Sequence, residues 1–272
     1  MVEVVEQLPL VQERVLRPMK IGIIGIGMVG GALAKIFDRP ILYDPPKGIG
    51  NRNEINEADV IFICVPTPYD KKFDLSIVIE SLDILEGSKV VVIKSTVLPG
   101  TTENLQHEYP QHKFLFNPEF LTEVTADQDM RYPDRQIVGY TKQSYTIAQD
   151  IMAMLPLAPF ERVMPAKEAE MVKYANNTWF FTKVVWANQL YDVCQAVGVD
   201  YEKVKESMAQ DKRIGRSHLE IWHKGYRGVG GKCLPKDAKA FMDYARKYGF
   251  PMTLLEKANE INEKLKTIIL NV

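Results

Sequence analysis

The sequence predicts an α/β fold with a doubly wound parallel sheet, followed by an all-helical domain. Short, continuous apolar runs at 21–24, 60–65 and 89–93 alternate with helical stretches, which is typical of parallel strands covered on both faces. From Pro165 onward, long helical patterns replace the strands. The expected parts are an N-terminal extension at 1–19, a Rossmann-like sheet domain at 20–164 and a helical domain at 165–272.

Composition argues against several classes of protein. The chain has 272 residues and a formal net charge of −1, so it carries no basic field that would drive binding to nucleic acid or to anionic membranes. Its cysteines lack a CxxC motif and its four histidines lack ligand spacing, which argues against disulfides and against a metal site. Neither a signal-peptide core nor a membrane span is visible, and we therefore expect a cytoplasmic protein.

Apolar runs and cap residues define the elements of the sheet domain. The expected strands are 21–24, 40–44, 60–65, 89–93 and 114–116. A helical run follows the first strand to about Phe37, and Asp74 can cap a helix that continues to Leu85. Each strand is thus followed by a helix or by a loop at the same edge of the sheet.

Turn residues mark where each helix of the second domain begins or ends. Gly198 ends the first helix, Asp200 can cap the second, and Gly249 closes the third. The last helix carries a Glu260/Lys264 pair four residues apart. The expected helices are 168–197, 200–210, 235–248 and 253–269, with a glycine-rich loop at 225–231.

A glycine motif directly follows the first strand and opens a helix. In it Gly25 permits a tight turn, Gly27 lets the backbone approach a pyrophosphate, and Gly30 allows the helix to pack closely on the strand. Asp44 ends the second strand, where it can bind a ribose 2′-hydroxyl and would repel a 2′-phosphate, which favours NAD over NADP. The residues expected at the cofactor are Gly25, Ile26, Gly27, Met28, Val29, Gly30 and Asp44, with Val65, Pro66 and Thr67 after the third strand. A structural glycine turn and a simple loop are the plainer alternatives.

Lys173 and Asn177 lie four residues apart on the longest expected helix and so share one face. On so apolar a helix, a lysine and an amide are costly to bury unless they are used. A snorkelling lysine and a hydrogen-bonded asparagine would explain the pair equally well.

Cys233 follows a pair of glycines and lies just before a helix that Pro235 can begin. A helix N-terminus and neighbouring lysines both favour the thiolate, the reactive form of a cysteine. Asp237 lies four residues further on and can share the same face. A packed cysteine in a glycine turn is the alternative, and we adopt it for Cys64 and Cys194, which lie within apolar patterns.

Two further segments end strands at the same rim of the sheet. Glu119 and Glu123 follow the fifth strand and are candidate acid–base groups, although exposed loop carboxylates are usually only solvated. Lys94 and Thr96 follow the fourth strand. Substrate is expected at this rim, because ligands of open sheets lie beyond the carboxyl ends of the strands.

Seven sequence blocks together resemble the UDP-glucose/GDP-mannose dehydrogenase family of nucleotide-sugar 6-dehydrogenases. They occur in the order of the family and span about residues 20–262. The blocks are GIIGIGMVG (22–30), ICVPTP (63–68), KSTVLPGTT (94–102), FNPEFLTE (116–123), EAEMVKYANNTW (168–179), RIG with SHL (213–219) and GGKCLPKD (230–237).

The resemblance implies roles for residues within these blocks. Cys233 would be the nucleophile, while Lys173 and Asn177 would bind the reacting sugar and stabilise developing negative charge. Asp237 would assist proton movement, and Glu123 would assist hydrolysis of the covalent intermediate. The other residues implied are Phe120, Leu121, Arg213 and Gly230 at the substrate, Lys236 at the cofactor, and Thr96 at the cofactor and at a catalytic water.

Such an enzyme oxidises a primary alcohol to a carboxylate by two hydride transfers to NAD. A cysteine carries the intermediate between the two transfers, first as a thiohemiacetal and then as a thioester. The resemblance also implies a nucleotide-sugar substrate such as UDP-glucose, a place in polysaccharide biosynthesis, and a homodimer formed through the long helix. Neither a nucleic-acid partner nor a membrane partner is expected.

Family members carry a third, C-terminal domain that helps to hold the nucleotide, and we expect no room for it in 272 residues. Two alternatives therefore stay open. One is a two-domain β-hydroxyacid dehydrogenase that uses Lys173 and Asn177. The other is a binding or assembly protein whose catalysis is impaired.

Overall fold

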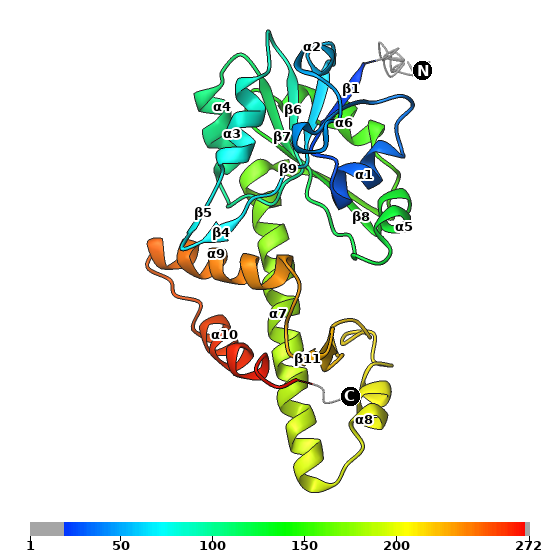
Figure 1. Cartoon of the computed structure of the whole chain (residues 1–272), viewed down its shortest axis with the longest axis vertical. Helices are drawn as coiled ribbons and strands as arrows, with labels where there is room; N and C mark the ends of the chain where they lie inside the picture. The colour runs from blue at the N-terminus through cyan, green and yellow to red at the C-terminus, as the bar shows by residue number, and fades with distance from the viewer. Residues whose placement is uncertain (1–18, 270–272) are drawn as a thin grey trace, which may run out of the picture.

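A computed structural model describes residues 19–269 of the chain, so most of the expected extension at 1–19 lies outside the described residues. The α/β part and the helical part lie end to end, and a single long helix, α7 (Ala166–Val197), runs from one into the other (Figure 1). This arrangement confirms the expected fold class.

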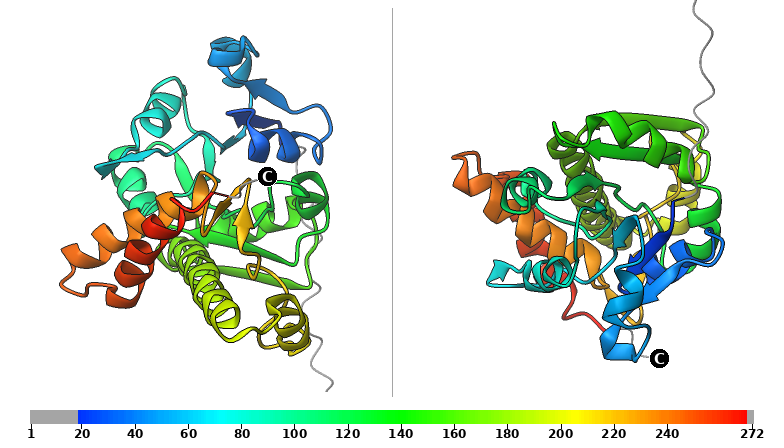
Figure 2. Two further views of the ribbon diagram at one scale, coloured as in Figure 1. Left: turned by 60° about the horizontal axis from the view of Figure 1, so that its bottom comes forward. Right: turned by 90° about the horizontal axis from the view of Figure 1, so that it is seen from above.

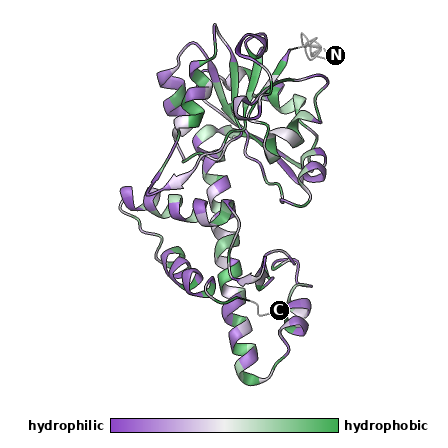
Figure 3. Ribbon diagram, in the orientation of Figure 1, coloured by the Kyte–Doolittle hydropathy of each residue, from purple (hydrophilic) through white to green (hydrophobic). Residues whose placement is uncertain are grey.

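The sheet has seven strands in the order β2-β1-β3-β6-β7-β8-β9. Neighbouring strands are parallel from β2 to β7, β8 is antiparallel to β7, and β9 is parallel to β8. The strands are β1 (Ile21–Ile24), β2 (Ile41–Tyr43), β3 (Val60–Ile63), β6 (Val90–Ile93), β7 (Lys113–Phe116), β8 (Arg135–Tyr140) and β9 (Phe160–Pro165). The five expected strands are all present, and the strands at the centre of the sheet are strongly hydrophobic (Figure 3).

Strands β8 and β9 were not expected from the sequence. The first begins with Arg135 and Gln136, and the second, at the edge of the sheet, reads Phe-Glu-Arg-Val-Met-Pro and is half exposed. Neither has the continuous apolar run of a central strand. Gly139 of β8 lets α7 begin directly against the sheet, because a Cβ there would lie 2.8 Å from the Cα of Ala166.

Helices cover both faces of the sheet and bury a separate apolar core on each face. Helices α3 and α4 and the first turns of α7 pack on one face, and α1 and α6 pack on the other. The elements are α1 (Met28–Ala34), η1 (Pro45–Lys47), α2 (Arg52–Ile55), α3 (Ser76–Asp83), α4 (Thr101–Glu108), α5 (Ala126–Arg131), η2 (Tyr145–Ile147), α6 (Ala148–Met154) and a hairpin of β4 (Tyr69–Asp70) and β5 (Lys72–Phe73).

In the helical domain, α9 and α10 pack along one side of α7, as two views show (Figures 1 and 2). Gly198, at φ +74°, ends α7, and the Asp200 side chain caps the next helix by accepting from the amide of Glu202. The elements are α8 (Tyr201–Met208), β10 (Trp222–His223), β11 (Tyr226–Arg227), α9 (Cys233–Lys247) and α10 (Thr253–Leu265).

Some details of this domain differ from the expectation. The short β10–β11 hairpin interrupts what was expected to be all-helical, because Trp222 and His223 pair with the strand that follows them. Helix α10 ends at Leu265, and Glu260 forms its ion pair with Lys257, one turn before it, while Lys264 contributes a weaker charge interaction. Within residues 19–269, no helix combines the length and apolarity needed to cross a bilayer, and no group of His, Cys, Asp and Glu side chains is arranged to hold a metal.

Candidate active site

The glycine motif forms a tight turn between β1 and α1. Gly25 has φ +87°, and Gly30 packs so closely that a Cβ there would lie 1.9 Å from the carbonyl oxygen of Gly25. At Gly27, in contrast, a Cβ would meet nothing within 4 Å. Gly27 and Met28 line a cavity of about 480 Å³ that reaches the loop at 123–128. The turn therefore leaves open backbone where a pyrophosphate needs close approach.

Asp44 lies under this turn, where it is 9% exposed. Its Oδ2 accepts a 2.8 Å hydrogen bond from the amide of Ile26, and Lys47 donates to the carbonyl of the same residue at 2.5 Å. The other carboxylate oxygen of Asp44 accepts no hydrogen bond from the described residues. The chain thus presents one free acidic oxygen beside the glycine turn, which is where the sequence predicted a ribose contact.

The end of the third strand packs against the glycine turn and the next loop. A Cβ on Gly25 would lie 2.9 Å from Val65, which is buried. The hydroxyl of Thr67 donates to the carbonyl of Thr96 at 2.7 Å. Pro66, between them, is exposed. The main chain after β3 and the main chain after β6 are therefore held together at the rim.

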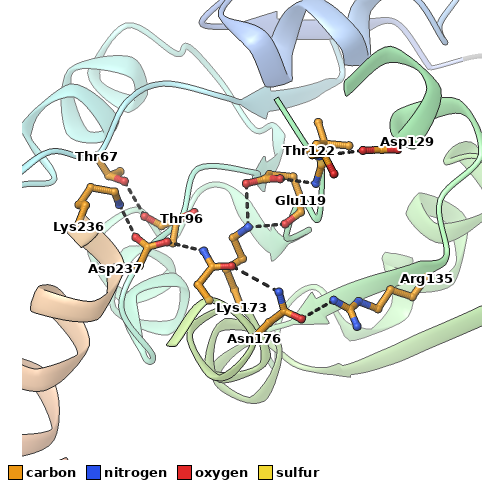
Figure 4. Close-up of polar contacts among 12 residues, drawn as sticks. Thr67, Thr96, Glu119, Thr122, Asp129, Arg135, Lys173, Asn176, Lys236 and Asp237 are labelled. Carbon is orange, nitrogen blue, oxygen red and sulfur yellow. Dashed lines mark hydrogen bonds and ion pairs between the residues drawn. The ribbon is translucent and has the colours of Figure 1, made fainter. Parts of the chain in front are cut away.

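Lys173, on α7, is buried and faces the loop that follows β7 (Figure 4). Its ammonium donates to the Glu119 carboxylate at 2.8 Å and to the Glu119 main-chain carbonyl at 2.6 Å. Burial raises the pKa of Glu119, but the charge and hydrogen bond of Lys173 outweigh it and leave the pKa below its ordinary value. The snorkelling alternative for Lys173 is thus wrong, because its ammonium points inward.

Asn177, one turn further along α7, faces α9. Its side-chain amide donates to Asp237 Oδ2 at 2.6 Å, and the Lys236 ammonium lies 2.7 Å from Asp237 Oδ1. Asp237 is 1% exposed. The carboxylate is therefore buried between an amide and a cation, the pairing that a buried charge requires.

Cys233 is the first residue of α9, and its side chain is exposed. The expectation of a favoured thiolate is wrong for this structure. Desolvation, followed by the carboxylates of Asp237 and Glu119, raises the pKa of the thiol, and Lys173 and Lys236 only partly offset the rise. The same interactions show that the side chains of Asp237, Glu119, Lys173 and Lys236 all lie within electrostatic reach of the Cys233 thiol.

Other expected residues lie around this cluster or apart from it. The Arg135 guanidinium carbon lies over the Phe120 ring, 3.9 Å from the ring centroid. The main-chain amide of Leu121 donates to the Glu119 carboxylate at 2.8 Å. Gly230 is covered by hairpin side chains, since a Cβ there would lie 1.8 Å from Tyr226 Oη.

Two expected residues do not join the cluster. Glu123 is exposed on the rim of the cavity near Gly27, and its nearest cation is Lys224 at 3.5 Å. The guanidinium of Arg213 is exposed and bonds to Asp211 at 2.6 Å. Neither side chain contacts Lys173 or Cys233 among the described residues.

The structure adds residues that the expected site did not include. Glu119 was a candidate acid–base group at the rim to which the family resemblance gave no role, and it is the direct partner of Lys173. Arg135 donates to Asn176 at 2.7 Å, and Asn176 contacts Asn177 at 3.5 Å, so a polar chain reaches Asp237 (Figure 4). Arg135 lies on strand β8, which was not expected from the sequence. The only signal for its role was a charged residue just before the apolar residues Ile137 and Val138.

Comparisons with known proteins identify the family of both domains. The NAD binding domain and the central domain of the UDP-glucose/GDP-mannose dehydrogenase family match residues 49–155 and 167–264. UDP-glucose 6-dehydrogenase TuaD of Bacillus subtilis is 32% identical over 96% of this chain and 58% of its own length. UDP-glucose 6-dehydrogenase AglM of Haloferax volcanii is 35% identical over 85% of this chain and 58% of its own length.

A solved structure gives the same result. A UDP-glucose dehydrogenase from Pyrobaculum islandicum superposes with a TM-score of 0.79 at 28% identity, over 95% of this chain and 70% of that one. The chain spans a little over half the length of the two curated relatives. It belongs to the UDP-glucose/GDP-mannose dehydrogenase family, of which it carries the NAD binding domain and the central domain.

Proposed function

We propose that this chain oxidises the primary alcohol of a nucleotide sugar, of the UDP-glucose type, to the carboxylate with NAD as the oxidant. One observation carries the proposal. Lys173, Asn177 and Asp237 are buried together beside the thiol of Cys233, at the junction between the NAD binding domain and the helical domain. Single-hydride chemistry requires no thiol, whereas oxidation to the acid benefits from a covalent intermediate.

The residues around the glycine turn fit the proposed NAD site. The open space at Gly27 suits a pyrophosphate, and the free oxygen of Asp44 suits a ribose hydroxyl. The same carboxylate would repel a 2′-phosphate. When bound, the nicotinamide supplies the hydride acceptor for each of the two oxidations.

Lys173 and Asn177 are the donors in the first oxidation. They hydrogen-bond the sugar oxygen as its proton leaves and stabilise the negative charge that develops on it. Asp237, held by Asn177 and Lys236, takes up the proton through a water. The products of this step are the aldehyde and one reduced cofactor.

Cys233 makes the second oxidation possible. Its sulfur bonds to the aldehyde carbon, the thiol proton passes to solvent, and the carbonyl oxygen becomes the oxyanion of a thiohemiacetal. Loss of a hydride from that carbon gives the thioester. Water then adds, the carbon–sulfur bond breaks, and its electron pair returns to sulfur. The net change is one alcohol, two NAD and one water converted to one carboxylate, two NADH and three protons.

Glu119 is better placed than Glu123 to activate the hydrolytic water. Its carboxylate is buried against Lys173 and influences the thiol of Cys233, whereas Glu123 is exposed and pairs with Lys224. We therefore assign the role implied for Glu123 to Glu119, with Thr96 beside the same water. Phe120 and Leu121 follow Glu119 directly and line the sugar.

The long helix α7 supports the proposed homodimer. Trp179, Trp186 and Val193 recur every seven residues and are 62%, 49% and 58% exposed, which forms an apolar stripe suited to pairing with a second copy. In that dimer Arg213, free of the cluster of its own chain, reaches the substrate of the partner subunit. The free cysteines at positions 64, 194 and 233 are consistent with a reducing, cytoplasmic setting.

The test is the ratio of NADH to acid with a panel of nucleotide sugars. We expect two NADH per carboxylate from the wild type and no acid from Cys233→Ser, with Cys194→Ala as the matched control that retains the ratio. One NADH per turnover, with a β-hydroxy acid as the better substrate, would establish the β-hydroxyacid dehydrogenase alternative. NAD binding without turnover on any substrate would instead establish a binding protein.

A further inference from the structure

Lys94, the residue that follows β6, is a buried ammonium that the proposed chemistry does not use. Its side chain is 3% exposed. Among the described residues its ammonium forms no ion pair, and its hydrogen bond goes to Asn117 Oδ1 at 2.6 Å. Lysines are seldom buried so completely without a carboxylate in contact. The fold therefore maintains a costly cation within electrostatic reach of Glu119 and Lys173.

Asn117 is fixed in the orientation that receives this cation. It is 0% exposed, its main-chain amide donates to Ile93, and its side-chain amide donates to the carbonyl of Ile137 at 2.8 Å. These bonds leave the side-chain oxygen facing Lys94. Since Asn117 begins the loop that carries Glu119 two residues later, Lys94 holds the base of that loop.

Lys94 also acts on Glu119 by charge. The titratable groups that face Lys94 are Cys64 at the end of β3, Glu119 after β7, and Lys173 on α7. Glu119 in turn faces Lys94, Lys173 and the thiols of Cys64 and Cys233. Glu119 thus lies in the field of two cations, one that bonds to it directly and one below its loop.

Burial shifts the pKa values of Lys94 and Cys64 in opposite directions. It lowers the pKa of Lys94 to about 8, so the ammonium remains protonated at neutral pH, and it raises the pKa of Cys64 to about 12, so that thiol remains neutral. At neutral pH, Lys94 is thus charged and Cys64 is not.

We propose that Lys94 is a positioning residue for Glu119, holding its loop through Asn117 and keeping its carboxylate ionised for the hydrolytic step. The inference rests on the proposed function, in which Glu119 accepts a proton from the water that attacks the thioester. A carboxylate can accept that proton only when it is ionised, and burial alone opposes ionisation. Lys173 must also bind the substrate oxygen, so a second cation that does not bind substrate keeps Glu119 ionised when Lys173 is engaged.

The variants Lys94→Met and Lys94→Gln remove the charge, and the second keeps a donor for Asn117. Lys94→Arg keeps the charge. Lys89→Met is the matched control, because Lys89 lies just before the opposite end of β6 and bonds to main-chain carbonyls. NADH affinity and thermal unfolding show which variants fold. If Lys94→Met does not fold, the result for Lys94→Gln decides the test.

The first readout is the titration midpoint of the Glu119 carboxyl, followed by carbon NMR of protein labelled at glutamate and assigned with Glu119→Gln. We expect the midpoint to rise by roughly half a pH unit or more in Lys94→Gln, and to stay unchanged in Lys94→Arg and Lys89→Met. An unchanged midpoint in Lys94→Gln overturns the proposal, as does an equal rise in the lysine 89 control.

The second readout is the pH profile of acid release. We expect its acidic limb to move to higher pH in Lys94→Gln with KM for the sugar unchanged, a split that a loss of packing alone would not produce. If the wild-type chain releases no acid, the proposed function fails, and the NMR titration still decides whether Lys94 controls Glu119.

Discussion

Lys173 and Glu119 are joined twice, because the Lys173 ammonium donates to both the side-chain and the main-chain oxygen of Glu119, at 2.8 and 2.6 Å. The contact connects α7 with the loop after β7, 54 residues earlier in the chain. Both side chains are nearly buried, with 6% and 11% of their surface exposed. The helix that bears the helical domain is thereby locked to the rim of the sheet at the candidate active site.

Removing one partner of this pair leaves the other charge buried. Lys173→Met should lower the free energy of unfolding by about 3 kcal/mol, as is typical of a broken buried pair. The double variant Lys173→Met with Glu119→Gln should recover most of that loss, because no charge is left unpaired. Urea unfolding of the wild type, the two single variants and the double variant measures the coupling. Additive losses would mean that the pair is not coupled.

Asp237 opposes the ionisation of Cys233 more than any other charged side chain does. After desolvation, its carboxylate is the main cause of the raised pKa of the thiol. Asp237→Asn should therefore lower the thiol pKa and accelerate alkylation of Cys233 by iodoacetamide several-fold at neutral pH. The background is small, because burial raises the pKa of Cys64 to about 12 and Cys194 is buried. Cys233→Ser defines that background. If the alkylation rate of Asp237→Asn depends on pH as that of the wild type does, Asp237 does not raise the pKa of the thiol.

Local patterns in the sequence were sufficient for part of this site. The glycine motif, the four-residue spacing of Lys173 and Asn177, and the position of Cys233 at the start of a helix all follow from neighbours along the chain. Each of these features depends on short-range geometry, which sequence spacing reports directly.

Features that depend on contacts between distant segments could not be predicted in this way. Strand β9 lies at the edge of the sheet and contains Glu161 and Arg162, so it lacks the continuous apolar run of a central strand. The partnership of Glu119 with Lys173 requires the loop after β7 to meet α7. The raised pKa of Cys233 reflects partial desolvation and two carboxylates from separate elements, which outweigh the lysines Lys173 and Lys236.

Two glycines of the cofactor turn should respond differently to the same substitution. Gly27→Ala meets nothing within 4 Å, so stability should change by less than about 0.5 kcal/mol. The added methyl group occupies space that the pyrophosphate needs, and Kd for NADH should rise roughly tenfold or more. Fluorescence titration with NADH and thermal unfolding together check this prediction.

Gly30→Ala is the contrasting variant, because its methyl group would lie 1.9 Å from a main-chain oxygen. It should destabilise the fold by about 1–3 kcal/mol. If Gly27→Ala binds NADH as the wild type does, the open space at this glycine is not the pyrophosphate site.

The apolar stripe on α7 should determine the oligomeric state. Trp186→Glu places a charge at the centre of the proposed interface and should shift the chain from dimer to monomer in light scattering at micromolar concentration. Leu157→Glu is the control, because Leu157 is 85% exposed on the sheet domain and lies off the helix. A Trp186→Glu protein that remains dimeric would place the interface elsewhere.

Glu170 should make stability depend on pH between about 4.5 and 7. This fully buried residue of α7 accepts hydrogen bonds from the amide of Thr102 and from its hydroxyl, at 2.8 and 2.6 Å. Burial nevertheless raises the pKa of Glu170 from 4.5 to about 7, against these bonds. The folded protein therefore keeps a proton that the unfolded chain has already released, and this contribution to stability is complete below pH 4.5 and lost as the pH rises to 7.

Glu170→Gln removes this titration. Relative to that variant, the free energy of unfolding of the wild type should fall by at most about 1.4 kcal/mol per pH unit across this range, on the order of 3 kcal/mol in total. Urea unfolding of both proteins at pH 4.5, 5.5, 6.5 and 7.5 gives the difference directly. A difference that stays constant with pH would show that Glu170 titrates alike in the folded and unfolded states.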